Sequence, residues 1–306
     1  MRRPISSVIA IALIITCGFI ESAYSQNQNS KPGVAKGAAR LSLPVKDGSV
    51  RFVVIGDTGS GAKEQRQLAD VLLSYRQAFP FEFVLMMGDN LYGGESAVDY
   101  KAKFEDVYKP LLEAKVKFYA TLGNHDESNQ RFYDHFNMNG NEYYSFKKGK
   151  VSFYSLNSNY MDQKQVKWIE DELSKDDSEW KICFFHHPPY SSGAKHGSDT
   201  QLREVVEPIF IKHGVDVVFT GHEHFYERIK PQNGIHYFIS GAGGKLRPGD
   251  VKVSNLTEKS FDKDLSFMLI EIVDDQMHFQ VISRTGQTID AGVLTTRESK
   301  VKATTK

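Results

Sequence analysis

Residues 51–59 read Arg-Phe-Val-Val-Ile-Gly-Asp-Thr-Gly, a short apolar run that passes directly into a glycine-flanked turn with one carboxylate. An apolar run of this length, rich in β-branched residues and bounded by glycine, predicts a buried β-strand. Asp57 then stands just beyond the carboxyl end of that strand. In open α/β sheets, binding sites gather outside the carboxyl ends of the strands, so this stretch predicts both a fold class and the place of a site.

The same arrangement recurs further along the chain. Apolar runs at 81–87, 118–122, 181–185 and 215–219 are followed by residues with metal-binding side chains, namely Asp89, Asn124, His186 and the pair His222 and His224. Between these runs, apolar residues at helical spacing predict helices at 62–78, 163–173 and 202–211. Strands separated by helices predict βαβ units, and fully apolar strands predict sheets that are covered on both faces.

Two further segments have the pattern of antiparallel strands. Residues 143–156 are typical of a hairpin with its turn at 147–150, and residues 266–294 alternate around turns at 274–275 and 285–286. We therefore predict a single α/β domain over residues 50–296, in which two packed mixed β-sheets are flanked by helices. The polar residues 297–306 are expected to form a disordered tail.

The N-terminus has the pattern of an export signal. Two arginines are followed by an uncharged stretch over residues 4–20 and by Ala23-Tyr24-Ser25, which predicts a signal peptide over residues 1–25 and a secreted or periplasmic protein. A retained membrane anchor is less favoured, because the apolar run is shorter than the roughly 20 residues that a spanning helix needs. We expect no stable membrane insertion after cleavage. The polar residues 26–49 are interpreted as a flexible linker.

Composition excludes several classes of protein. The 306 residues contain 38 Lys and Arg against 38 Asp and Glu, and a chain without net charge is not expected to bind nucleic acid. Apart from Cys17 in the predicted signal, Cys183 is the only cysteine, so no internal disulfide is expected in the mature protein. Cys183 lies in an apolar run and is interpreted as a buried small residue rather than a nucleophile.

Each polar strand end has an ordinary structural explanation when it is taken alone. Gly-Asp sequences are mostly turns, Asp126 in Gly-Asn-His-Asp suits a helix cap, and the prolines after His187 suit a rigid loop. The pair His222 and His224 is harder to explain in this way, because two imidazoles at a strand end suit metal binding. Taken together, in this order and all at strand ends, the residues predict a metal site.

The types of side chain indicate which metals would bind. Asp89 lies where one carboxylate could bridge two ions about 3.5–4 Å apart, as in two-metal hydrolases. Oxygen and imidazole donors are too hard for copper(I), and the thiolates of structural zinc sites are missing from the set. The phenol of Tyr92 favours a trivalent ion, with iron(III) as the first candidate, and the second ion would then be divalent.

The sequence blocks resemble those of the purple acid phosphatases, within the calcineurin-like metallophosphoesterase superfamily. The five motifs of that family are matched by Gly56-Asp57-Thr58-Gly59, Gly88-Asp89-Asn90-Leu91-Tyr92, Gly123-Asn124-His125-Asp126, Cys183-Phe184-Phe185-His186 and Gly221-His222-Glu223-His224. Cys183 replaces the valine of the fourth motif. The resemblance spans about residues 50–294. The chain is similar to the compact tartrate-resistant type, and the resemblance implies a four-layer αββα sandwich.

The resemblance also implies a role for each site residue. Iron(III) would be bound by Asp57, Asp89, Tyr92 and His224. The divalent ion (iron, zinc or manganese) would be bound by Asp89, Asn124, His186 and His222. His125 and His196 match the family's two substrate-side histidines, which bind the phosphate and assist catalysis; a surface histidine outside the site is the structural alternative for both.

The implied activity is that of an exported acid phosphatase, which hydrolyses small-molecule or protein phosphomonoesters by attack of a metal-bound hydroxide. A phosphodiesterase or nucleotide hydrolase on the same scaffold is the alternative, and a non-catalytic binding protein ranks lower because all seven ligands are present. A redox activity of the iron pair is a further alternative. Lys245 and Arg247 are expected on a solvated loop. The sequence contains no indication of oligomeric state.

Overall fold

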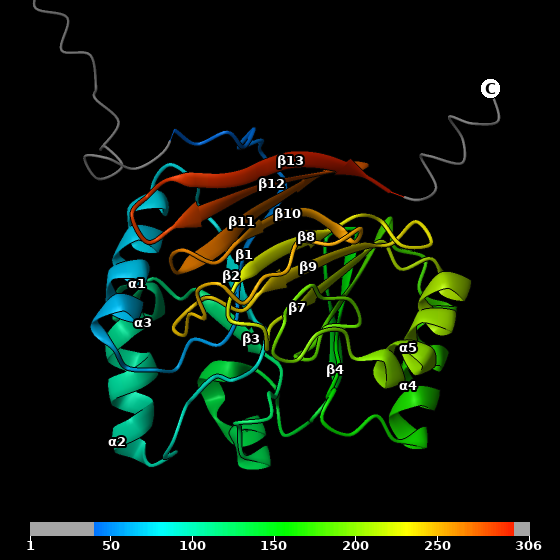
Figure 1. The fold of residues 1–306 in the computed structure, drawn as a ribbon, viewed down its shortest axis with the longest axis horizontal. Coiled ribbons are helices and arrows are strands. Elements are labelled where there is room, and N and C mark those ends of the chain that lie inside the picture. Colours follow the sequence, from blue (N-terminus) through cyan, green and yellow to red (C-terminus); the bar gives the residue numbers. More distant parts are fainter. Residues whose placement is uncertain (1–39, 297–306) are drawn as a thin grey trace, which may run out of the picture. The chain divides into compact units, whose positions relative to one another are not determined.

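Two β-sheets form the centre of the computed structural model, which describes residues 40–296 (Figure 1). Within that range, one sheet has six strands in the order β13-β12-β11-β1-β2-β3, and the other has seven in the order β10-β8-β9-β7-β6-β5-β4. The strands of the first sheet are β1 (Val50–Ile55), β2 (Phe83–Met86), β3 (Lys117–Ala120), β11 (Ser266–Val273), β12 (Gln276–Ser283) and β13 (Thr288–Thr295). Those of the second are β4 (Tyr144–Lys148), β5 (Val151–Ser155), β6 (Trp180–Phe184), β7 (Val217–Thr220), β8 (Tyr226–Ile229), β9 (His236–Ser240) and β10 (Thr257–Phe261).

Helices cover the outer face of each sheet. Helices α1 (Lys63–Tyr75) and α3 (Asp106–Glu113) lie on the first sheet, with the short α2 (Ala97–Tyr100) and a π-helical turn (Lys101–Glu105) leading into α3. Helices α4 (Gln163–Lys175) and α5 (Thr200–His213) lie on the second sheet. The layers therefore run helix, sheet, sheet, helix, which confirms the predicted fold class.

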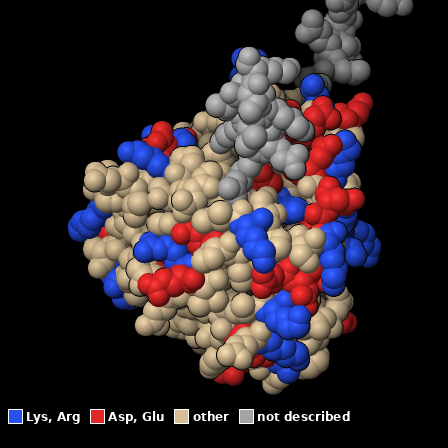
Figure 2. Space-filling model, turned by 90° about the vertical axis from the view of Figure 1, so that its right-hand side faces the viewer, with Lys and Arg blue, Asp and Glu red and all other residues tan. Residues whose placement is uncertain are grey.

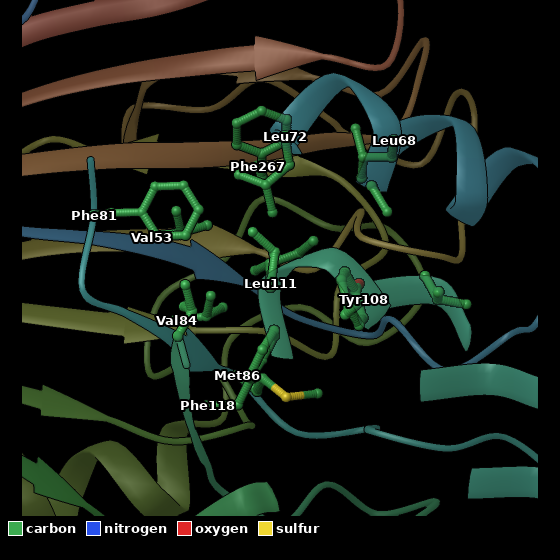
Figure 3. Close-up of a cluster of buried hydrophobic side chains, with 14 of the residues drawn as sticks. Val53, Leu68, Leu72, Phe81, Val84, Met86, Tyr108, Leu111, Phe118 and Phe267 are labelled. Carbon is green, nitrogen blue, oxygen red and sulfur yellow. The ribbon is translucent and has the colours of Figure 1, made fainter. Parts of the chain in front are cut away.

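The alternation of side chains along the strands builds three separate cores. In β1, Val53 packs against the helices of the first sheet, whereas Phe52 points between the two sheets. Figure 3 shows the first of these cores, where Leu68 and Leu72 of α1 lie over the strands. In β6, Cys183 is fully buried against the helices of the second sheet, as expected for a small core residue.

Parallel pairing brings the functional strand ends to common edges. Strands β1, β2 and β3 are parallel neighbours, as are β5, β6, β7 and β9. The carboxyl ends of parallel strands meet at the same edge of a sheet, so the polar residues after β1, β2 and β3 lie together. Those after β6 and β7 lie together in the same way. The predicted hairpin is confirmed as β4 and β5, and the C-terminal antiparallel segment as β11 to β13.

The segment before β1 differs from the prediction of a flexible linker up to residue 49. In its described part, residues 40–49, Leu43 is buried and the backbone N–H groups of Val45 and Lys46 each donate to the Glu271 carboxylate at 2.7 Å. Glu271 is fully buried in β11 and needs these donors. The linker prediction is therefore wrong for residues 40–49. The predicted signal peptide, the rest of the linker and the tail lie outside the described residues.

Short elements were the ones that the sequence pattern did not predict, namely α2, α3, β8 and β10. Helix α2 does carry a local signal, because Ser96 and Asp99 form a reciprocal capping box at its start.

None of the helices within residues 40–296 has the length and hydrophobicity that a membrane-spanning helix needs. On the face shown in Figure 2, acidic and basic side chains lie interspersed among uncharged ones.

Candidate metal centre

Three of the predicted ligands have backbone angles that residues other than glycine rarely adopt. Asp57, Asp89 and His222 have φ angles of 55°, 49° and 67°, in the left-handed region. A residue other than glycine reaches this region only at an energetic cost, and such strain collects at functional sites. Each of the three follows the last residues of a strand, so the backbone turns sharply there. The turns direct the three side chains toward one another across the edges of the two sheets.

One group of donors forms around Asp57. The hydroxyl of Tyr92 lies 3.1 Å from Asp57 Oδ1 and 3.1 Å from His224 Nε2, and His224 Nε2 lies 3.4 Å from Asp57 Oδ1. Ligands that surround one ion at about 2.0–2.2 Å lie about 3 Å from one another. Carboxylate, phenol and imidazole thus stand at the mutual distances that a shared metal ion requires.

A second group forms around His186, which is fully buried. Its Nε2 lies 3.0 Å from Asn124 Oδ1, 3.1 Å from His222 Nδ1 and 3.4 Å from Asp89 Oδ1. Its Nδ1 lies 2.8 Å from the carbonyl oxygen of Met87, which only accepts hydrogen bonds. The ring proton is therefore on Nδ1, so Nε2 can only accept and cannot donate to the acceptor oxygens of Asn124 and Asp89.

No proton lies between His186 Nε2 and the oxygens of Asn124 and Asp89, and a cation bound there would be attracted to all three atoms. Burial lowers the pKa of His186 well below its ordinary value, so the ring is not expected to supply that cation by taking up a second proton. Ligand atoms of Asp57, Asp89 and His186 lie within 4.8 Å of one another, which places the two donor groups side by side with Asp89 near both. The residues present therefore fit a metal centre.

Burial also shifts the pKa values of the other donors. It raises the pKa of Asp57 well above the ordinary value, with the nearby Asp89 charge adding to the effect, and it raises the pKa of Tyr92. It lowers the pKa of His222 to about 2 and that of His224 to about 3. Neutral imidazoles are the form that binds metals, and a bound cation would reverse the shifts of the carboxyl and phenol groups.

Asp126 holds the loops that carry Asp89 and Asn124. Its carboxylate accepts hydrogen bonds from the backbone N–H groups of Gly123 at 2.8 Å, Asn90 at 2.8 Å and Leu91 at 3.1 Å. It does not cap a regular helix, which was the structural explanation considered for it. Gly123 is equally constrained, because a Cβ atom there would lie 2.2 Å from Asp89 N. The acidic fourth position of Gly-Asn-His-Asp was the sequence signal for this role.

The two predicted substrate-side histidines lie at the mouth of the centre. The ring of His125 lies 5.1 Å from that of Tyr92, and its backbone N–H donates to Asp89 Oδ1 at 3.0 Å. The ring of His196 stacks on that of His222 at 4.3 Å. Both residues are exposed, and His196 lines a pocket of about 320 Å³ together with His222. The structure thus brings all nine predicted residues to one place.

Sequence reasoning missed further residues of the centre. Glu223, between the two histidines of Gly-His-Glu-His, is fully buried and accepts from Arg247 Nη1 at 3.3 Å. Lys245 places its ammonium 4.7 Å from the centre of the Tyr92 ring. Lys245 and Arg247 do lie on a loop, as expected, but both are half-buried there. His187 lies 4.6 Å from His222, ring to ring. In the sequence, only the position of His187 directly after His186 could have indicated that it lies near the centre.

Comparisons with known proteins agree with this geometry. A family model described as calcineurin-like phosphoesterase matches residues 50–226. Purple acid phosphatase 17 of Arabidopsis thaliana is 25% identical over 296 aligned residues, which cover 84% of this chain and 85% of the relative. Tartrate-resistant acid phosphatase type 5 of Oryctolagus cuniculus is 27% identical over 254 residues, or 68% of this chain and 78% of the relative.

Solved structures share the fold at lower identity. GAP50, described as the anchor in the inner membrane complex of Plasmodium, superposes with a TM-score of 0.71 at 21% identity, covering 81% of this chain and 89% of its own. The purple acid phosphatase PPD1 from yellow lupin seeds superposes with a TM-score of 0.66 at 18% identity, covering 83% of this chain and 55% of its own. Since one of these proteins is described as an anchor, the shared fold alone does not indicate catalysis.

Proposed function

The chain belongs to the calcineurin-like phosphoesterase family, and we propose that it is an exported acid phosphatase that hydrolyses phosphate monoesters at a dinuclear centre. Its similarity to purple acid phosphatase 17 and to tartrate-resistant acid phosphatase type 5 indicates a phosphoesterase of the purple acid phosphatase type. One observation carries the proposal of a metal centre. The unprotonated Nε2 of the buried His186 faces two acceptor oxygens, an arrangement that a cation would satisfy.

The two donor groups suggest how the ions are distributed. Asp57, Tyr92 and His224 would hold iron(III), because phenol and carboxylate are hard anionic donors. Asn124, His186 and His222 would hold a divalent ion of iron, zinc or manganese. Asp89 would serve both ions. When bound, the ions would supply Lewis-acid chemistry, in which they lower the pKa of water and offset the negative charge of the phosphoryl group.

The residues of the chain itself would bind and orient the substrate. His125 and His196 lie on opposite donor groups, one beside Tyr92 and the other beside His222, so a phosphate at the centre would be within reach of both. Their ring N–H groups would donate to its non-bridging oxygens, and one of them would deliver a proton to the leaving alcohol. Lys245 adds a positive charge on the Tyr92 side and would attract an anionic substrate.

The first test is the visible spectrum of the iron-loaded protein. We expect a phenolate-to-iron(III) band that colours the protein purple and that Tyr92→Phe removes, whereas Tyr133→Phe, outside the centre, keeps it. A colourless protein with verified iron content would overturn the assignment of Tyr92. Rates on p-nitrophenyl phosphate and bis-p-nitrophenyl phosphate then separate a monoesterase from a phosphodiesterase, and a higher rate on the diester would contradict the proposal.

Export is proposed from residues 1–25 alone, which lie outside the described residues. If the signal is cleaved after Ser25, the mature protein begins at Gln26, and the intact mass of protein from the extracellular or periplasmic fraction shows this directly. Full-length protein in the membrane fraction would favour a retained anchor instead.

A further inference from the structure

A second pocket, of about 420 Å³, opens beside Asn124. Three loops form its walls: the loop after β3 with Asn124 and Asp126, the loop after β5 with Ser158 and Tyr160, and His187 after β6. The proposed function does not use this space. Because Asn124 is a proposed metal ligand, whatever occupies the pocket lies directly next to the reacting phosphate.

The loop after β5 is held rigidly in place. The buried side chain of Gln165 accepts from Asn157 N–H at 2.7 Å and donates to the carbonyl oxygens of Asn157 at 3.0 Å and Tyr160 at 2.9 Å. Asn159 Nδ2 donates to the carbonyl oxygen of Gly123 at 3.0 Å, which ties this loop to the one that carries Asn124. The ring of Tyr160 is nevertheless 76% exposed. The backbone therefore fixes an uncovered aromatic residue at the rim of the pocket.

Hydrogen bonds also orient His187 in this pocket. The hydroxyl of Ser158 accepts from the backbone N–H of His187 at 3.0 Å and lies 2.9 Å from His187 Nδ1. We assign the hydroxyl proton to the bond with Nδ1, which leaves the ring proton on Nε2. His187 thereby contributes a polar donor to the wall that separates this pocket from the one beside His222.

The charges of the pocket narrow the possible occupants. Asp126 and Asp199 line it, whereas none of the described residues around it is lysine or arginine. Asp126 is bonded to backbone N–H groups, and Asp199 caps α5 by accepting from Leu202 N–H at 2.9 Å. A group with further phosphates would meet the Asp199 carboxylate here, and no lysine or arginine within residues 40–296 lines the pocket to offset the repulsion. An uncharged occupant is favoured.

We propose that this pocket is the leaving-group subsite and that it selects phosphomonoesters of uncharged alcohols that carry an aromatic ring, which stacks on Tyr160. The inference rests on the proposed function, since it places the scissile phosphate at Asn124. Aromatic pairs add to affinity beyond the area that they bury, and the bonded backbone of Tyr160 limits the conformational freedom that is lost on binding. Aryl phosphates, including phosphotyrosine, and nucleoside monophosphates share this chemistry.

A binding experiment tests the subsite without catalysis. Benzylphosphonate, in which a methylene replaces the ester oxygen of phenyl phosphate, and propylphosphonate are titrated calorimetrically into metal-loaded wild type, Tyr160→Ala and Tyr160→Phe. We expect the ratio of the two affinities to fall about 3- to 10-fold in Tyr160→Ala, as for the loss of one aromatic pair, and to be kept in Tyr160→Phe. Phe132→Ala, which removes another exposed aromatic residue away from the pocket, is the matched control and should keep the ratio.

An unchanged ratio in Tyr160→Ala would overturn the subsite. The hydrolysis of phenyl phosphate, phosphotyrosine and adenosine 5′-monophosphate, each relative to glycerol 3-phosphate, then shows which aromatic source is preferred. In Tyr160→Ala we expect the preferred substrate to lose kcat/KM through a higher KM. If the wild type selects benzylphosphonate but hydrolyses no monoester, the proposed function fails and the subsite stands. If it hydrolyses monoesters with the same relative rates in all variants, the proposed function stands and the subsite fails.

Discussion

At the scale of single residues, Asp57 and Tyr92 are acidic groups that the fold places where their charged forms are least favoured. Burial raises the pKa of both, and the Asp89 charge adds to the effect. Asp57 also accepts hydrogen bonds from the Tyr92 hydroxyl and from the backbone N–H of His222. Without a cation, the ionisation of these groups would destabilise the fold, and a metal bound as proposed would offset that cost.

This predicts a pH-dependent effect of Asp57→Asn in the metal-free protein. The pKa of Asp57 is raised in the folded state above its unfolded value of 3.8, so its ionisation opposes folding and does so increasingly as the pH rises. Thermal melts in the presence of a chelator should show Asp57→Asn more stable than wild type at pH 8, with the difference shrinking toward pH 4. Wild type that stays the more stable of the two at pH 8 would contradict the argument. With metal added, the variant should gain less stability than wild type.

Lys245 provides a spectroscopic prediction at the same scale. Its ammonium lies 4.7 Å from the centre of the Tyr92 ring, where a cation stabilises the electrons of the ring. In the iron-loaded protein, Lys245→Gln should move the visible band to longer wavelength, because charge transfer out of the phenolate then requires less energy. Lys245→Arg keeps a cation there and should stay close to the wild-type band. Identical spectra of Lys245→Gln and wild type would rule out this contact.

At the scale of elements, Glu223 connects three loops around the centre. It lies on the loop after β7, accepts from Gly197 N–H at 2.8 Å on the loop with His196, and accepts from Arg247 on the loop after β9. Burial raises the pKa of Glu223 to about 7, although Arg247 works against this shift. The positions of His196 and Arg247 therefore depend on one side chain that lies between two proposed ligands.

Glu223→Gln should loosen these loops and weaken the fold. The variant keeps the shape of the side chain but replaces one of its two acceptor oxygens with an amide donor. Either Gly197 N–H or Arg247 then loses its acceptor, and we expect a loss of about 1–2 kcal/mol in the free energy of unfolding. Urea titration measures the loss, and hydrogen exchange should be faster over residues 193–198. Glu170→Gln, which breaks an exposed ion pair with Lys212, should cost clearly less stability than Glu223→Gln. Equal effects of both variants would show that Glu223 holds nothing together.

At the scale of the whole molecule, the centre exists because two sheets pack face to face. Phe52 of β1 lies between them, stacked on Phe83 with ring centres 5.1 Å apart and edge-on to Phe153 of the second sheet at 5.3 Å. Gly221 N–H donates to the carbonyl oxygen of His186, and His186 Nδ1 contacts Met87 O across the sheets. The donor groups keep their distances only while this packing holds.

Phe52→Ala should therefore disturb both stability and the centre. Removing a fully buried phenylalanine leaves a cavity between the sheets, and we expect a loss of about 3–5 kcal/mol in the free energy of unfolding. Denaturant titration measures the loss, and metal content after dialysis should fall with it. Phe132→Ala removes a ring that is 63% exposed and should change stability by less than about 0.5 kcal/mol. A small effect of Phe52→Ala would mean that the sheets do not depend on this contact.

The sequence alone was enough to predict the alternation of strands and helices, the layered α/β class and the nine residues proposed for the centre. Apolar periodicity reports local burial, and metal-binding side chains directly after apolar strands are visible without coordinates. Four contacts became visible only in the folded chain. Residues 40–49 bond to Glu271, and Glu223 bonds to Arg247. Lys245 lies over the Tyr92 ring, and Tyr160 lines a pocket beside Asn124. Each of these contacts joins loops far apart in the chain. Their meeting is set by the packing of two sheets, which no local pattern of residues encodes.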